Sequence, residues 1–503
     1  MDLEVAGSPG DLIEFVSQCA VIGFSSTFQQ NVASIALSQR IKERYPHVVI
    51  VFGGANMEDE MGPEILRSFE HIDYVVSGEG EEALPAFLKA LAGGHDPGAT
   101  PGVVRRGPRG VESAASAPPL RNLDSLPLPD FDDYFKRVTD LELKGVESYG
   151  RVLPFESSRG CWWGEKHHCT FCGLNGGTMQ FRTKHPDKVF EELNHQADRY
   201  GVDFFFATDN ILGHREGPVL FEKTAQSDCG FKFFYEVKAN LSRDQIHALH
   251  QGGLRAVQPG IESLSTHVLA LMRKGSTMLQ NVLALKWFRY YRIQVHWNPI
   301  WGFPGEQEAD YARELEVLRL ISHFDPPGSA SRIWLERFSP YFDQREQFPI
   351  DAVRPERSYS FVYPPRVNLE RIAYFFDYNM ADVAPASIHE ATREWVSEWT
   401  ARWNSRRRDS LVYRRAGERI LINDKRGPEP HGFHSLSGPN ATAYEFISDH
   451  IRSIAQVAAH ARATHGLDVS EDDVRESLDQ FCVDGLAVAE DGKYLGLALP
   501  QDR

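Results

Sequence analysis

The chain has 503 residues, of which 42% are hydrophobic and 25% charged, and its formal net charge is -16. This length suits several globular domains, and the composition excludes an intrinsically disordered protein. The negative charge argues against bulk nucleic-acid binding, and the sequence contains no apolar run long enough to span a membrane. The N-terminal segment also lacks the basic and apolar regions of a secretory signal, so we expect a cytoplasmic protein.

Three short apolar runs near the N-terminus predict β-strands at 20–27, 48–55 and 72–78. The stretch 31–45 between the first two has the apolar spacing of a helix. Alternating strands and helices are typical of a parallel, doubly wound sheet. We therefore predict an α/β domain over residues 1–95.

Small and hydroxyl residues end each of these strands. Ligands of such sheets bind beyond the carboxyl ends of the strands, where small residues let the backbone approach closely. The alternative is that the glycines only form tight turns. The candidate cofactor-binding residues here are Ser25, Ser26, Thr27, Gly53, Gly54, Gly78, Glu79 and Gly80.

A segment rich in Gly, Pro, Ala and Ser predicts a linker with a small hairpin at 96–145. From 146 to 345 the strand and helix pattern returns in roughly six units, which predicts a partial (β/α)6 barrel with functional groups at the strand C-termini. The expected strands begin at 152 and continue at 203–208, 231–237, 254–260, 293–300 and 331–338.

The last two segments differ in character. Residues 346–410 predict a helical extension with Tyr374, Phe375 and Phe376 in its core. Residues 411–503 predict a hairpin, three helices and a closing Asp-Gly hairpin, which is the layout of a winged-helix domain. The expected elements are a hairpin at 411–424 and helices at 441–450, 452–464 and 470–485.

Of the six cysteines, Cys161, Cys169 and Cys172 fall within twelve residues, in a C-x7-C-x2-C spacing. This pattern is typical of a reducing compartment and one metal site, not of a disulfide framework. Four thiolates saturate a cubane iron-sulfur cluster, so three leave one iron open to a small chelating molecule. The alternative is a zinc site that adds His167 or His168. We favour the cluster because the cysteines follow a predicted barrel strand and no second C-x2-C pair completes a zinc ribbon.

The residues around this loop resemble the radical S-adenosylmethionine (SAM) superfamily. More narrowly, they are similar to the cobalamin-dependent members that mature ribosomally synthesised peptides (RiPPs), a subgroup that shares the seven-residue gap. The resemblance extends over most of the chain from about 20 to 345. It rests on the segments SSRGCWWGEKHHCTFCGLNG, ATDN, YEVKANL, QPGIES, NPIWGFPGE and RFSPYF.

The resemblance implies a 4Fe-4S cluster held by the three cysteines as catalytic ligands, and SAM bound at its open iron. Cleaving SAM to a 5'-deoxyadenosyl radical needs a low cluster potential, which implies an external electron donor such as flavodoxin or ferredoxin. A charged residue at a strand end can also be merely solvated or structural. The residues expected to contact SAM are Phe171, Thr208, Asn210, Glu236, Lys238, Glu262, Asn298, Gly302 and Gly305.

The N-terminal sheet resembles the Rossmann-like cobalamin-binding domain of the same enzymes, through FSST, FGGAN and SGEGE. The Asp-x-His-x-x-Gly motif for a lower cobalt ligand is missing from the sequence. Only nineteen residues precede the strand at 20–27, so we expect a sheet truncated at its N-terminal side. A missing strand could expose an edge or remove part of the cofactor cradle.

The segment 411–503 resembles the PqqD-like element that binds a leader peptide by adding it as a strand to its hairpin. A DNA-binding winged helix is the alternative, but acidic residues at 471–479 disfavour contact with phosphates. The resemblance therefore implies C-methylation of a precursor peptide at an unactivated carbon. The alternatives are cobalamin-free peptide crosslinking or epimerisation, and a noncatalytic peptide-binding partner.

Overall fold

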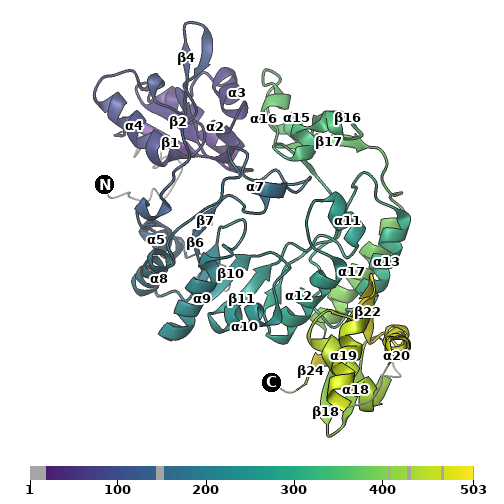
Figure 1. Cartoon of the computed structure of the whole chain (residues 1–503). Helices are drawn as coiled ribbons and strands as arrows, with labels where there is room; N and C mark the ends of the chain where they lie inside the picture. Colours follow the sequence, from purple (N-terminus) through teal and green to yellow (C-terminus); the bar gives the residue numbers. More distant parts are fainter. Residues whose placement is uncertain (1–17, 143–151, 406–407, 428–431, 466–469, 502–503) are drawn as a thin grey trace. The chain divides into compact units, whose positions relative to one another are not determined.

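The computed structural model describes residues 18–142, 152–405, 408–427, 432–465 and 470–501. The chain divides into two compact units, which we describe separately, and Figure 1 follows it from end to end. Unit 1 comprises residues 1–151, 160–184 and 334–379, and unit 2 comprises residues 152–159, 185–333 and 380–503. The cysteine loop thus shares unit 1 with the N-terminal sheet. None of the described helices is long and apolar enough to cross a membrane.

The first sheet of unit 1 has five strands in the order β1-β2-β3-β4-β5. The first three run parallel, as predicted, and the last two form the predicted hairpin. The hairpin pairs antiparallel with β3, so it extends this sheet and does not lie in a linker. The truncation expected before β1 concerns residues 1–17, which lie outside the described part of the chain. The strands are β1 (Val21–Ser25), β2 (Val49–Gly53), β3 (Tyr74–Val76), β4 (Val103–Gly107) and β5 (Gly110–Ser113).

Helices cover both faces of this sheet (Figure 1). Alternate residues of β2 point to opposite faces, as the pleat of a strand requires. Ile50 and Phe52 pack against α2 (Gln30–Arg44) and α3 (Met61–Ser68). Val51 packs against α4 (Gly80–Ala92) on the other face. The sheet is therefore buried between two layers, and its strand-end loops are left at the edge.

Residues 334–379 form a three-stranded sheet in the order β15-β17-β16, with three single-turn helices. The predicted helical extension is therefore wrong for this part and correct only for α17 (Ile388–Asn404) in unit 2. Four prolines between 349 and 365 prevent a long helix here. Of the three aromatic residues expected in a core, only Phe376 is buried. The elements are β15 (Leu335–Glu336), α14 (Pro340–Asp343), β16 (Ile350–Pro355), α15 (Tyr359–Val362), α16 (Leu369–Ile372) and β17 (Phe375–Met380).

Unit 2 contains a five-stranded parallel sheet in the order β12-β11-β10-β9-β6, and a separate parallel pair, β13-β14. The predicted strand at 331–338 is divided between β14 in unit 2 and β15 in unit 1. The described strands are thus those of a parallel αβ sheet, whereas the predicted six-unit barrel stays a prediction. The strands are β6 (Val152–Phe155), β9 (Phe204–Ala207), β10 (Lys232–Glu236), β11 (Leu254–Gln258), β12 (Gln294–Val295), β13 (Ile300–Trp301) and β14 (Ser331–Arg332).

An aromatic layer joins this sheet to its helices. The ring of Phe233 lies between those of Phe205 and Phe221, and Tyr235 packs on Phe155. These side chains point to one face of the sheet, so the opposite face remains for the site. The helices that follow the strands are α8 (Pro186–Tyr200), α9 (Glu216–Ser227), α10 (Arg243–Gln251), α12 (Met278–Tyr290) and α13 (Glu308–Leu320).

The C-terminal part of unit 2 contains the predicted hairpin, β18-β19, and the three predicted helices. β20 and β24 lie on the two sides of the hairpin, in the order β20-β19-β18-β24, and β22-β23 form the closing hairpin. The winged-helix assignment stays a prediction. The elements are β18 (Leu411–Ala416), β19 (Arg419–Asp424), β20 (Gly432–Ser437), α18 (Gly438–Asp449), α19 (Ile454–His465), α20 (Glu471–Val483), β22 (Ala487–Glu490), β23 (Lys493–Gly496) and β24 (Leu499–Pro500).

A buried lysine joins this C-terminal part to the helices around the parallel sheet. Lys286 of α12 donates from Nζ to the carbonyl oxygens of Ser448 and Gly496, each 2.6 Å away. Arg243 of α10 pairs with Asp449 at the end of α18. A buried amine that satisfies two carbonyls is costly to remove, so these elements form one packed unit.

Candidate functional site

The three cysteines lie on the loop of unit 1 that follows β6 in the chain. All three are half-buried thiols, and none of the six cysteines is in a disulfide. The Gly164 amide, at the start of the single-turn helix α7 (Gly164–His167), donates to the Cys161 sulfur at 3.3 Å. The Cys172 amide donates to the Cys169 carbonyl at 3.2 Å. Backbone hydrogen bonds thus hold the loop around its thiols.

The two histidines of this loop make other contacts. His168 Nε2 lies 2.9 Å from the Cys172 carbonyl oxygen, and the His167 ring stacks on Trp163 at 4.1 Å. Among the described residues, no three His, Cys, Asp or Glu side chains are grouped so that they could hold one metal ion. A cluster places its thiolates on separate irons, so a set of three thiols on one loop fits it.

The cysteine loop packs against α14 just before Cys172 and against β15 just after it. The Gly173 amide donates to Glu336 Oε2 at 2.9 Å, and Tyr341 donates its amide to the Thr170 carbonyl at 3.1 Å. A Cβ atom at Gly173 would lie 2.3 Å from the Arg337 carbonyl oxygen. Only glycine fits at this approach.

The strand-end loops of the first sheet are fixed by side-chain amides. Asn56 Nδ2 donates to Ser26 Oγ at 2.9 Å, and Ser26 Oγ donates to Asn31 Oδ1 at 3.1 Å. Gly54 has φ +90°, and a Cβ atom there would lie 2.7 Å from the Ser26 carbonyl oxygen. Ser26 and Gly54 therefore form a structural junction between the first two loops, beside the exposed Ser25 and Thr27.

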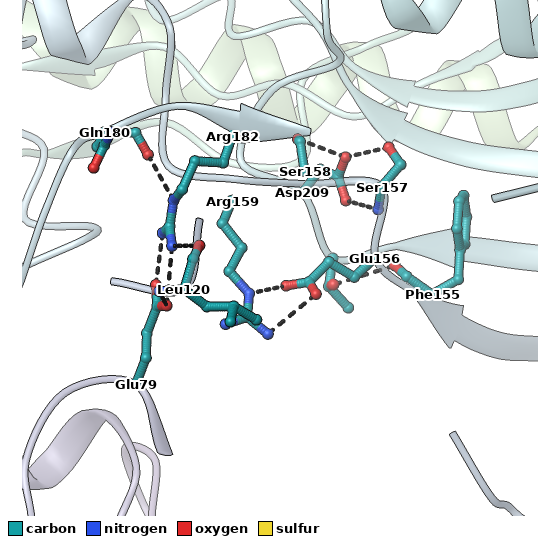
Figure 2. A network of polar contacts seen from close by, with 11 residues as sticks. Glu79, Leu120, Phe155, Glu156, Ser157, Ser158, Arg159, Gln180, Arg182 and Asp209 are labelled. Atoms are coloured by element: carbon teal, nitrogen blue, oxygen red, sulfur yellow. Dashed lines mark hydrogen bonds and ion pairs between the residues drawn. The ribbon is translucent and has the colours of Figure 1, made fainter. Parts of the chain in front are cut away.

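Glu79 has a structural role that the sequence did not predict. Its two carboxylate oxygens accept from Arg182 at 2.6 and 2.9 Å, as Figure 2 shows. The Leu120 amide also donates to Glu79, and the Leu120 carbonyl accepts from Arg182, both at 2.7 Å. Arg182 lies ten residues beyond Cys172. The pair thus ties the end of the cysteine loop to the third strand-end loop of the sheet.

The glycines on either side of Glu79 leave open space. At Gly78, with φ +84°, and at Gly80, a Cβ atom would meet no protein atom within 4 Å. Neighbouring protein atoms therefore do not require these glycines. The open space is what a backbone that a ligand approaches would need, and it fits a cofactor at this edge.

In unit 2, Asp209 joins the ends of β6 and β9 (Figure 2). Its carboxylate accepts from the Ser157 amide at 2.8 Å and from the hydroxyls of Ser157 and Ser158 at 2.5 and 2.7 Å. Burial raises the pKa of Asp209 to about 6, against the hydrogen bonds from the two serines, which lower it. Thr208 beside it donates to the Phe155 carbonyl at 3.2 Å, and Asn210 is half-buried.

The face of the sheet opposite the aromatic layer carries several predicted residues. The rings of Phe206 and Phe234 stack there at 4.2 Å, and Phe206 is 43% exposed. Two residues further along each strand, the same face continues to Thr208 and Glu236. Gln258 is the register partner of Glu236 on β11. This face therefore has an apolar floor with polar groups at its carboxyl edge.

Glu236, Lys238 and Glu262 lie around Lys274, a residue that the sequence analysis missed. Lys274 Nζ donates to Glu262 Oε1 at 2.7 Å, and Lys238 Nζ donates to the Lys274 carbonyl at 2.6 Å. Burial raises the pKa of Glu236 to about 7, although the charge of Lys274 lowers it. Glu262 Oε2 is buried and has no hydrogen-bond partner among the described residues. It is an acceptor that fits a hydroxyl or ammonium of a bound cofactor.

The GFPG segment after β13 is organised by Glu306, also missed from sequence. Its carboxylate accepts from the amides of Gly302 and Phe303, both at 2.9 Å. Gly302 and Gly305 have φ of +99° and +93°, a region that favours glycine. The Gly302 amide is therefore already bound by Glu306, so a contact with SAM at Gly302 would have to use its other atoms. Asn298 is exposed, and its Oδ1 accepts from the Ser329 amide at 2.8 Å.

Two of the organising carboxylates could not be recognised because their partners are remote in sequence or are backbone amides. Arg182 is 103 positions from Glu79, and Glu336 is 163 positions from Gly173. The one available signal was the glycine pattern after Cys172, which indicates close backbone approach. The aromatic Phe171 before the last cysteine is half-buried. Its predicted contact with SAM, like those of the other site residues, stays a prediction.

A family model matches the part of the chain that carries the loop. Residues 155–318, which include all three cysteines, match the model of the radical SAM superfamily. A domain of this family implies a 4Fe-4S cluster and SAM as cofactors, as predicted, and an external electron donor.

Curated relatives cover parts of the chain. It is 24% identical over 328 residues to "Uncharacterized methyltransferase PH0819" of Pyrococcus horikoshii, covering 62% of this chain and 68% of that protein. It is 23% identical over 322 residues to the "Anaerobic magnesium-protoporphyrin IX monomethyl ester cyclase" of Synechocystis sp., covering 61% and 60%. It is 30% identical over 181 residues to the "Cobalamin-dependent radical SAM methyltransferase TokK" of Streptomyces tokunonensis, covering 35% and 25%. The chain thus spans between a quarter and about two thirds of the length of these relatives. The names of these three proteins do not mention a peptide substrate.

Two solved structures share the fold. One is the cobalamin-dependent radical SAM enzyme OxsB with aqua-cobalamin bound, with a TM-score of 0.59 and 16% identity, covering 75% of this chain and 58% of that one. The other is the radical SAM methyltransferase TsrM of Kitasatospora setae with cobalamin and a 4Fe-4S cluster bound, with a TM-score of 0.58 and 15% identity, covering 78% and 82%. At these identities the likeness shows the fold alone.

Asp209→Ala is expected to lower the free energy of unfolding by about 2–4 kcal/mol, because an amide and two hydroxyls lose their shared acceptor and each unsatisfied donor costs about 1–3 kcal/mol. The matched control is Asp203→Ala, since Asp203 is exposed and pairs only at the surface with Lys232 at 2.6 Å. It should cost less than about 1 kcal/mol. Urea denaturation of the full chain measures both, and equal losses would contradict the role of Asp209.

The pH dependence checks the same residue. With its pKa raised to about 6, native Asp209 keeps a proton that the unfolded chain has released. Its contribution to the free energy of unfolding therefore falls as the pH rises from about 4 to about 6. The free energy of unfolding of Asp209→Ala should lack this fall between about pH 4 and about pH 6. Urea denaturation at several pH values measures it, and the wild type and the variant should differ most at the acid end.

Proposed function

We propose, from the premise that residues 155–318 form a radical SAM domain, that this protein is a cobalamin-dependent radical SAM enzyme that methylates carbon in a ribosomally synthesised precursor peptide. The observation that carries the proposal is the set of three thiols on one loop that follows β6 in the chain, inside the matched region. No fourth cysteine lies on this loop. Three ligands leave one iron of a cubane open for SAM.

The residues of this chain would hold three cofactors. Cys161, Cys169 and Cys172 would hold the cluster; Glu262, with its unpartnered buried oxygen, would accept a hydrogen bond from SAM. The strand-end loops of the first sheet, open at Gly78 and Gly80, would receive cobalamin. When bound, these groups supply a 5'-deoxyadenosyl radical and a transferable methyl group. The share of the protein is to orient them and exclude water.

The peptide substrate is supported by the C-terminal part of unit 2. Among the described strands, β20 lies at the edge of its sheet. Both sides of the predicted docking hairpin are already paired, by β20 and β24, which are the two edge strands of this sheet. β20 has six residues and β24 only two, so β20 offers the longer edge to an added peptide strand. Strand addition uses backbone hydrogen bonds, and pockets for alternate side chains give specificity. Phe433 on β20 is 67% exposed and would flank such a peptide.

An external reductant completes the proposal. SAM cleavage needs a cluster potential near the low end of the range from about -700 to +450 mV. Flavodoxin or ferredoxin is the donor class that this requirement favours.

Replacement of any one of the three cysteines by Ala is expected to abolish 5'-deoxyadenosine formation. The wild type, reconstituted without oxygen, should hold about four irons per chain and cleave SAM when reduced. Cys482→Ala is the matched control, because burial raises the pKa of this thiol to about 11 and it lies on α20, away from the loop in sequence. Iron analysis and chromatography of the nucleoside are the measurements. A wild type without iron or without SAM cleavage would overturn the proposal.

Binding of the precursor peptide is expected to slow amide hydrogen exchange in residues 432–437. An added strand pairs with the outward amides of β20, which solvent otherwise reaches. Mass spectrometry of the full chain with and without the precursor measures this, and the same peptide with a scrambled leader is the control. Binding that leaves exchange in this segment unchanged would reject strand addition at β20.

A further inference from the structure

The amide after the third cysteine has an unusual acceptor. Gly173 donates its N–H to the carboxylate of Glu336 at 2.9 Å, and Glu336 belongs to β15, in the same compact unit. A Cβ atom at Gly173 would also lie 2.7 Å from the Glu336 Cβ. The absence of a side chain at 173 thus lets a carboxylate approach the backbone beside Cys172.

A second carboxyl faces the other end of the same segment. Glu58 follows the second strand-end loop of the first sheet, and the Gly177 amide lowers its pKa, against burial, which raises it. Burial raises the pKa of both carboxyls. The described groups that lower these two pKa values are backbone amides, and none of them is a cation. Each end of the glycine-rich segment 173–177 therefore faces a carboxyl group. No described cation lowers the pKa of either carboxyl.

The first cysteine has the opposite environment. There the Gly164 amide donates to the sulfur of Cys161 at 3.3 Å. Hydrogen bonds to cluster sulfurs and nearby charges are two of the ways a protein sets a cluster potential. An N–H aimed at a sulfur stabilises the added electron and raises the potential, whereas a nearby negative charge lowers it. An amide that is engaged by a carboxylate is withdrawn from the sulfur.

We propose that Glu336 is a positioning residue that keeps the reduction potential of the cluster low by withholding the Gly173 amide from the Cys172 sulfur and by placing a negative charge beside it. Glu58 supports the same segment at Gly177. This inference rests on the proposed function, because it assumes a cluster on Cys161, Cys169 and Cys172. A low potential is the property that SAM cleavage demands.

The test is an anaerobic redox titration of the reconstituted full chain, followed by electron paramagnetic resonance at pH 8 without SAM or cobalamin. Glu336→Gln keeps a carbonyl acceptor for Gly173 but removes the charge, and Glu336→Ala removes both. At a fixed potential, Glu336→Gln should raise the ratio of reduced to oxidised cluster about tenfold, which equals about 59 mV for a one-electron couple. Glu336→Ala should raise it at least as much.

The matched control is Glu165→Gln, which removes the same charge from an exposed position on the same loop. Solvent screens this charge, so the variant should titrate with the wild type. If Glu336→Gln also titrates with the wild type, the inference is overturned; Glu336→Gln decides the matter alone if Glu336→Ala assembles no cluster. A wild type that assembles no cluster would overturn the proposed function together with this inference, whereas a wild-type cluster with unshifted variants overturns only the role of Glu336.

Discussion

The ion pair between Glu79 and Arg182 fixes where the cysteine loop ends. Arg182 is buried, and it reaches both oxygens of a carboxylate at the third strand-end loop of the first sheet. A bidentate, charge-assisted pair of this kind fixes orientation as well as distance. Removal of Glu79 would leave the buried charge of Arg182 without its partner. Through this contact, a loop that follows a strand of unit 2 in the chain belongs to the compact unit of the N-terminal sheet.

Carboxylates that accept from backbone amides recur in both compact units. Glu336 binds the Gly173 amide, Asp209 binds the end of β6, and Glu306 binds the turn at Gly302. Each carboxylate holds a loop that the strands alone would leave variable. In an enzyme whose cofactors carry the chemistry, such fixed loops are the main contribution of the protein. The same atoms explain why several polar groups at the strand ends are structural and not open to a ligand.

The sequence predicted regular elements well and tertiary partners poorly. The strands at 48–55 and 203–208 were found because short β-branched and aromatic runs are visible to periodicity. The region 346–372 was misjudged as helical because its aromatic content outweighed four prolines that break helices. The small hairpin within 96–145 was predicted, but its pairing with β3 depends on a contact that no local pattern encodes.

The site showed the same division. The cysteine triad was predictable, because its chemistry lies in twelve consecutive residues. Glu79 was predicted to bind a cofactor because it follows a strand end. Its ion pair with Arg182 could not be predicted, because the two residues are 103 positions apart in the sequence. Glu236, Lys238 and Glu262 were predicted at separate strand ends, but their common neighbour Lys274 emerged only from the fold.

Unit 1 contains both the cysteine loop and the sheet that we propose to hold cobalamin. The most direct measurement is metal analysis of the full chain after anaerobic reconstitution with iron, sulfide and hydroxocobalamin, followed by desalting. We expect about four irons and one cobalt per chain, with the visible spectrum of bound cobalamin. Iron retained without cobalt would contradict the cobalamin-dependent reaction and leave a radical enzyme of another kind.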